Sequence, residues 1–272
     1  EKILHMANSN INEIVRFIEW NPDGLVPFDW QGGKREHWKA AVLQALREKD
    51  YWDIKAETLI DCCMNALPHG AAIPENTFYQ YLVCPRVSLE MLRPCRIALK
   101  TYWEKYVADD TKDAFARNPG CLPELVDRWI TSMPEQEYED LITSSIGCLK
   151  GGIGSGHSKE VFCVNLYRAL GIPARLRMLD GRLEYWQNGG FQAAGATAED
   201  TCHLILWGDG ALKLNDWEHY SVERFEEEGF QRLGLWEVSA ESEAERLDLQ
   251  VRPGIYRVLT TNRNKNGGQM VR

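Results

Sequence analysis

Apolar residues recur at helical spacing through the first half of the chain. The segment INEIVRFIEW places Ile11, Ile14, Val15 and Ile18 on one helical face, after capping residues at positions 8–10. The same pattern predicts further helices over residues 37–49, 56–67, 96–107 and 125–146, the last interrupted around Pro134. We therefore predict a helical N-terminal region over residues 1–145.

The pattern changes at GCLKGGIGSGH, residues 147–157. Five glycines in eleven residues predict a loop whose backbone goes where a Cβ would interfere. The next segment, SKEVFCVNLYRAL, is apolar nearly all round, which predicts a buried helix over residues 158–170 that ends at Gly171.

Beyond residue 173 the chain has the alternating pattern of short strands. The predicted strands are 174–179, 182–186, 203–207, 211–214, 220–225, 230–236, 247–251 and 255–261. The segment RNKNGG predicts a turn, and QMVR reads as the start of another strand, so we expect the last domain to be truncated. The predicted fold class is α+β.

The amino-acid composition argues against two classes of protein, those that bind nucleic acid and those that span a membrane. The 272 residues include 31 Lys and Arg against 40 Asp and Glu, a net charge of −9, and 44% are hydrophobic. A soluble globular protein is expected, and the negative charge argues against nucleic acid as a partner. No apolar run of about 18 residues is present, which argues against a membrane span.

The eight cysteines predict reduced, mostly buried thiols in a reducing compartment, which we take to be the cytoplasm. No C-x-x-C pair is present, so no zinc site is expected. The glycine-rich segment lacks the G-K-[ST] ending of a nucleotide-binding P-loop, so we expect no cofactor.

The segment from Gly152 to Phe191 joins the glycine loop, the buried helix, the sequence RALGIPAR and two predicted strands. It resembles the core of the transglutaminase-like superfamily, which has a papain-like fold. FYQYLVCPRVSLEMLRPCR (78–96) and PGIYRVLTTNRNKNGG (253–268) are similar to segments of a bacterial branch with a C-terminal β-sandwich. The resemblance implies a transglutaminase-like core over residues 146–200 and an antiparallel β-sandwich over 201–272.

In that family the loop delivers a nucleophilic Cys to the N-terminus of the central helix, and a His and an Asp complete a triad. Counting back from Arg168, the Cys position falls at Gly156, which has no side chain. We therefore expect a catalytically degenerate protein that binds a peptide, protein or glycan. Its candidate binding residues are Gly154, Gly156, Ser158, Glu184, Trp186 and Arg86.

The alternative is an active amide-bond hydrolase or transamidase with a rearranged nucleophile. Its candidate catalytic residues are Ser155, His157, His203 and Asp216, with Ser158, Cys148 and Cys163 as further nucleophile candidates. For Cys163 and His203 a structural interpretation competes with the catalytic one. Cys163 falls two helical turns inside the predicted core, and the strand that carries the family His aligns better with Glu184 than with His203.

Two side-chain groups also allow two interpretations each. Arg86, Glu90 and Arg96 either line the cleft, as the resembling branch suggests, or form an internal ion-pair network, which we favour. Four tryptophans at strand spacing either form a sugar-binding surface or belong to the sandwich core, which we also favour; they are Trp186, Trp207, Trp217 and Trp236.

Overall fold

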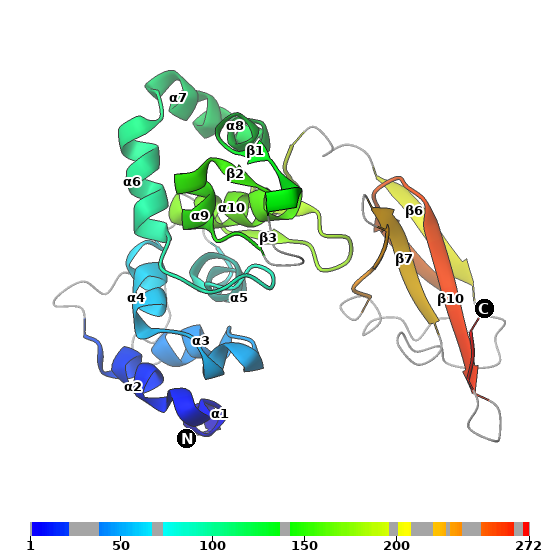
Figure 1. Cartoon of the computed structure of the whole chain (residues 1–272), viewed down its shortest axis with the longest axis horizontal. Coiled ribbons are helices and arrows are strands. Elements are labelled where there is room, and N and C mark those ends of the chain that lie inside the picture. Colours follow the sequence, from blue (N-terminus) through cyan, green and yellow to red (C-terminus); the bar gives the residue numbers. More distant parts are fainter. Residues whose placement is uncertain are drawn as a thin grey trace. The chain divides into compact units, whose positions relative to one another are not determined.

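The computed structural model describes residues 2–21, 38–66, 73–136, 142–195, 201–207, 220–226, 229–235, 246–263 and 269–271. These residues form a mixed α and β structure, which confirms the predicted α+β class (Figure 1). The chain divides into two compact units. One comprises Glu1–Leu176 with Leu183–Ala196, and the other comprises Arg177–Arg182 with Thr197–Arg272.

The larger unit is mainly helical. Its α-helices are α1 (Lys2–Met6), α2 (Ile11–Glu19), α3 (Trp38–Gln44), α4 (Ala56–Met64), α5 (Glu75–Phe78), α6 (Arg96–Tyr106), α7 (Asp109–Arg117), α8 (Leu122–Trp129), α9 (Ser145–Gly151) and α10 (Gly156–Ala169). Shorter helices are η1 (Asn8–Asn10), η3 (Glu48–Trp52), the π-helix η4 (Tyr79–Val83), η5 (Pro119–Cys121) and η6 (Pro134–Gln136).

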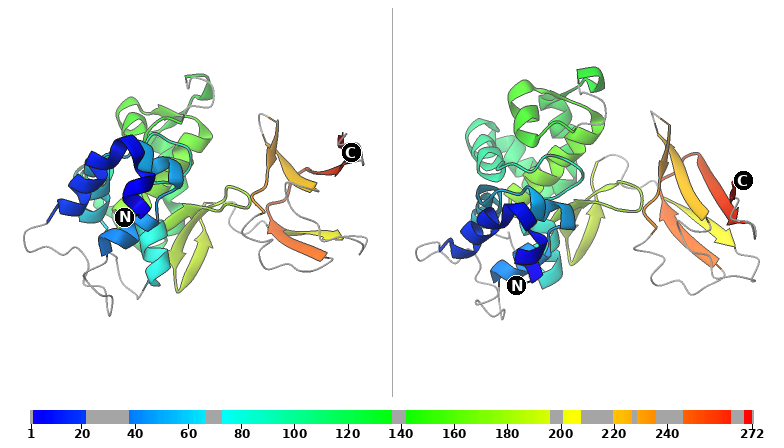
Figure 2. Two further views of the ribbon diagram at one scale, coloured as in Figure 1. Left: turned by 90° about the horizontal axis from the view of Figure 1, so that it is seen from below. Right: turned by 60° about the horizontal axis from the view of Figure 1, so that its bottom comes forward.

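Strands of this unit form two small sheets. The strands β1 (Thr131–Ser132) and β2 (Ile153–Gly154) pair in parallel, and β3 (Ala174–Leu176), β4 (Leu183–Gln187) and β5 (Gly190–Ala193) form an antiparallel sheet. In Figure 2 the yellow-green β4 and β5 lie beside the cyan η4, where the rings of Tyr81 and Phe191 meet at 5.1 Å.

Helix α10 is the centre of one of two apolar cores in this unit. Its buried residues include Phe162, Cys163, Leu166 and Tyr167, and α6, α8, α9 and β3 pack around it. The predicted buried helix is confirmed, because side chains at consecutive positions are buried rather than those of one face. The second core joins α2, α3, α4 and η4.

Three predictions from the local sequence pattern differ from the structure. The predicted face of α2 is wrong in part: Ile14 is buried with Phe17, whereas Ile11 is 41% exposed and Ile18 is 40% exposed. Residues 147–151, predicted as loop, belong to α9, because the Ser144 Oγ caps that helix by accepting the Gly147 N–H at 3.2 Å. Helix α7 was not predicted; among its residues only Phe115 is buried.

The elements described in the smaller unit are all strands. They are β6 (Cys202–Trp207), β7 (Tyr220–Glu226), β8 (Gly229–Arg232), β9 (Arg246–Val251), β10 (Tyr256–Arg263) and β11 (Gln269–Val271). β6 pairs with β9, and the other four form a sheet in the order β11-β10-β7-β8, all antiparallel. Apolar side chains of both sheets meet in one core, among them Leu204, Val222 and Leu249.

The strand predicted over 211–214 and most of the turn predicted over 263–268 lie outside the described residues. Within the described parts of the chain, no helix is both long enough and apolar enough to cross a bilayer.

Candidate functional site

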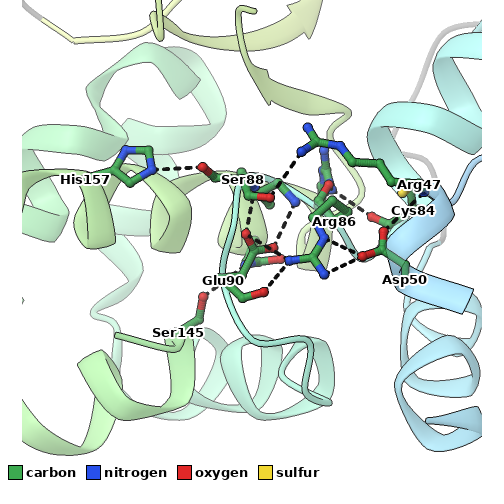
Figure 3. Close-up of polar contacts among 11 residues, drawn as sticks. Arg47, Asp50, Cys84, Arg86, Ser88, Glu90, Ser145 and His157 are labelled. Atoms are coloured by element: carbon green, nitrogen blue, oxygen red, sulfur yellow. Dashed lines mark hydrogen bonds and ion pairs between the residues drawn. The ribbon is translucent and has the colours of Figure 1, made fainter. Parts of the chain in front are cut away.

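The candidate site is the N-terminal end of α10 together with the segment of residues 84–95, which runs past it (Figure 3). The two are linked by a hydrogen bond between Ser88 Oγ and His157 Nε2, at 2.9 Å. The segment belongs to residues 78–96, one of the stretches that are similar to the bacterial branch, and α10 belongs to Gly152–Phe191, the stretch that resembles the superfamily core. The fold therefore brings together the most informative parts of the sequence.

Two serines hold the start of α10 in place. Ser155 is the N-cap, and its Oγ accepts the backbone N–H of Ser158 at 3.1 Å and lies 3.2 Å from the Ser158 Oγ. Ser158 is fully buried and accepts the backbone N–H of Thr143 at 2.9 Å. Both hydroxyls satisfy backbone groups at a helix end. This is a structural role for two residues that we considered as nucleophiles.

Gly156 is the first residue of α10, and the space around it is open. A Cβ built on Gly156 would have no neighbouring heavy atom within 4 Å, whereas one built on Gly154 would lie 3.1 Å from the Cys148 Sγ. Gly154 is therefore required for close packing, and Gly156 is not. Gly156 is therefore an exposed position without a side chain at the N-terminus of a buried helix.

His157 lies between two polar partners. Its Nε2 faces Ser88 Oγ at 2.9 Å, and its Nδ1 faces Glu160 Oε2, one helical turn along, at 3.3 Å. The side chains of His157 and Glu160 are 46% and 37% exposed. A hydroxyl, an imidazole and a carboxylate in this order can act as nucleophile, base and orienting group. Neither Ser88 nor Glu160 was predicted. Ser88 is 69 residues from His157, so no local pattern pairs them, whereas Glu160 is three residues from His157 and was within reach of a helical-spacing argument.

Buried charges fix the backbone that carries Ser88. The Glu90 carboxylate accepts the N–H groups of Val87 at 2.9 Å and Ser88 at 2.7 Å. Arg86 donates from Nε to the Asp50 carboxylate at 2.9 Å and also to the backbone carbonyl of Glu90 (Figure 3). Asp50, Arg86 and Glu90 are all buried. Arg86 and Glu90 thus form an internal ion pair as we favoured, whereas Arg96, the third member of the predicted network, donates to backbone carbonyls.

Two further buried arginines bind the carbonyls at the end of η4. Arg96 donates to the carbonyls of Leu82 and Cys84, and Arg168 donates to those of Cys84 at 2.7 Å and Arg86 at 2.9 Å. The C-terminal end of a helix attracts positive charge. Burial lowers the pKa of Arg168 to about 10, so its guanidinium is still charged at neutral pH.

Glu184 and Trp186 lie on β4, and their contacts described here are not with the start of α10. The Glu184 carboxylate accepts a hydrogen bond from Arg175 Nε at 2.8 Å, and Glu184 is buried. Trp186 is half-buried and meets the ring of Phe191 edge-on at 5.2 Å. Both side chains are engaged within the unit.

His203 lies on β6 in the smaller unit, where its Nδ1 faces Asp248 Oδ1 at 2.8 Å. This hydrogen bond lowers the pKa of the Asp248 carboxyl. The structure thus gives His203 a carboxylate partner other than the predicted Asp216, which lies outside the described residues together with Trp217 and Trp236. Trp207 is 72% exposed on the same strand.

None of the eight cysteines is in a disulfide. Cys148 and Cys163, the two considered as replacement nucleophiles, are buried, and burial raises the pKa of the Cys163 thiol well above its usual value. Buried thiols of this kind are inert. Among the described residues, no group of three or more His, Cys, Asp or Glu side chains is placed to hold a metal ion.

A small cavity lies behind the segment of residues 84–95. Its volume is about 20 Å³, enough for one ordered water, and it is lined in part by Glu90, Ser144 and Asn165. It is too small for a substrate group.

Comparison with protein-family models, with curated proteins and with solved structures finds no match.

Proposed function

We propose that the chain is a transglutaminase-like domain protein that has lost the cysteine nucleophile and binds a peptide or protein segment at the N-terminal end of α10. The observation that carries this proposal is Gly156. It occupies the first position of the buried helix, its surroundings are open, and the two cysteines nearest in sequence, Cys148 and Cys163, are buried in the core.

The architecture supports the family assignment. A buried helix followed by the antiparallel strands β3, β4 and β5 is the arrangement expected of a papain-like core. In the smaller unit, two antiparallel sheets share one apolar core, as the sheets of a β-sandwich do. Eight cysteines without a disulfide fit a protein of the cytoplasm.

A peptide is favoured over a glycan by the side chains next to Ser88. Leu89 is 70% exposed and Met91 is 65% exposed, and both belong to the segment that the buried charges hold rigid. Exposed apolar side chains on a fixed backbone are suited to anchor the side chains of a peptide. Sugars stack on exposed aromatic rings, but Trp186 is half-buried and packs against Phe191.

Filling the open space at Gly156 tests this proposal. A peptide array would identify a binding sequence for the wild-type protein, and calorimetry would then compare its Kd with that of Gly156→Trp. We expect the indole to cover the site and weaken binding at least 10-fold, which is about 1.4 kcal/mol. Ser9→Trp, at an exposed position of η1, is the matched control and should leave Kd unchanged. Equal Kd values for Gly156→Trp and the wild type would place the binding surface elsewhere.

An amide-bond hydrolase or transamidase with a rearranged nucleophile is the second candidate. One observation favours it, the Ser88–His157 hydrogen bond of 2.9 Å.

A further inference from the structure

We propose that Ser88 is a nucleophile, activated by His157 and oriented through Glu160, and that it hydrolyses carboxylic esters. This activity goes beyond the proposed binding function and does not depend on it. None of the three residues needs to hold a peptide for the step to occur, and the thiol chemistry of the resembling family has no part in it.

The geometry meets the requirements of a nucleophile, base and orienting group. Ser88 Oγ lies 2.9 Å from His157 Nε2, within the range for direct proton transfer. His157 Nδ1 lies 3.3 Å from Glu160 Oε2, so the carboxylate favours the tautomer with hydrogen on Nδ1 and a lone pair on Nε2. Figure 3 shows the Ser88 hydroxyl pointing toward the imidazole.

The backbone of Ser88 is held in place by buried charged groups, which is unfavourable in free energy unless they are paired. Asp50, Arg86 and Glu90 are charged groups buried next to one segment of chain. Both carboxylate oxygens of Glu90 accept hydrogen bonds from backbone N–H groups, those of Val87 and Ser88. A half-exposed serine on a backbone fixed in this way is preorganised, which is what a reacting group requires.

The step balances without a cofactor. The Ser88 oxygen attacks the ester carbonyl while its proton passes to His157 Nε2, and the tetrahedral intermediate then collapses. The bond to the alcohol oxygen breaks, and the alcohol leaves with the proton from His157. Water repeats the sequence on the acyl-serine, releasing the acid and restoring Ser88. The positive end of the α10 dipole lies beside His157, the second residue of that helix, and stabilises the negative charge on the intermediate.

Esters suit this site better than peptide amides. An ester carbonyl is more reactive and its alcohol is a better leaving group than an amine. The half-exposed His157 side chain also admits the water that deacylation needs.

Labelling with a fluorophosphonate tests the proposal, because this probe forms a stable adduct with an activated serine and releases fluoride. Intact mass and peptide mapping should give one adduct per chain, on Ser88. The labelling rate should fall at least 100-fold in Ser88→Ala and in His157→Ala. Ser9→Ala and His5→Ala, exposed residues of η1 and α1, are the matched controls and should label like the wild type.

Glu160 is a positioning residue, so its test needs a readout that misfolding would not mimic. Hydrolysis of p-nitrophenyl acetate by Glu160→Gln should show a 3- to 10-fold lower kcat with unchanged KM and Tm. Wild-type labelling no faster than that of Ser88→Ala, or an adduct on another residue, would overturn the proposal. If Ser88→Ala is not labelled but still binds peptide, the binding function stands. If the wild type is labelled on Ser88 but binds no peptide, only the binding function is refuted.

Discussion

Replacing Asp61 by alanine is expected to lower the free energy of unfolding by about 3–5 kcal/mol. Asp61 is a buried residue of α4 that caps α6. Its carboxylate accepts the backbone N–H groups of Cys95 at 2.8 Å, Arg96 at 2.7 Å and Ile97 at 3.0 Å. Alanine leaves three donors without an acceptor and removes a negative charge beside the buried Arg96.

Urea unfolding followed by circular dichroism measures this effect. Asp113→Ala is the matched control, because Asp113 is an exposed residue of α7, and it should change stability by less than about 0.5 kcal/mol. A loss below about 1 kcal/mol for Asp61→Ala would mean that water or another group caps α6.

Replacing Arg168 by leucine is expected to cost about 2–4 kcal/mol and to disturb the segment that carries Ser88. Arg168 is buried and donates to the carbonyls of Cys84, Arg86 and Ala174. Leucine fills part of the volume but removes all three hydrogen bonds, and only the Cys84 carbonyl keeps a second donor named here, Arg96. Because two of them belong to the segment of residues 84–95, fluorophosphonate labelling of Ser88 should also slow at 25 °C.

Arg168→Lys separates charge from geometry. Lysine keeps the positive charge but lacks the planar fork that reaches three carbonyls, so its stability should fall between those of the wild type and Arg168→Leu. Equal stabilities for Arg168→Lys and the wild type in urea would show that charge alone holds the segment.

Sequence pattern predicted the elements whose signal is local. The uniformly apolar segment around Cys163 became the buried α10, and the amphipathic segment from residue 96 became α6. Pattern failed for α2, where Phe17 rather than Ile18 is buried, because the partner core decides which face packs. The pattern also failed at α9, because the glycines of residues 147–152 predicted a loop where the structure has a helix capped by Ser144.

The candidate site was predicted only in part, because its contacts are long-range. The glycine loop pointed to Gly156 and His157, and the structure places both at the start of α10. Nothing in a local pattern could pair Ser88 with His157 across 69 residues. The sequence RALGIPAR drew attention to Arg168, but its role in binding the carbonyls of a distant segment depends on the fold.

The N-terminal end of α10 offers an open position, Gly156, that is suited to a thiol and carries none. Gly156→Cys tests it, with alkylation by iodoacetamide followed by mass across a range of pH. A thiol at a helix N-terminus beside an imidazole should have a pKa below the usual value of about 8.5, and so react quickly at pH 7. We expect one rapidly modified cysteine in Gly156→Cys and none at that rate in the wild type. An added thiol that reacts no faster at pH 7 than an ordinary exposed cysteine would contradict it.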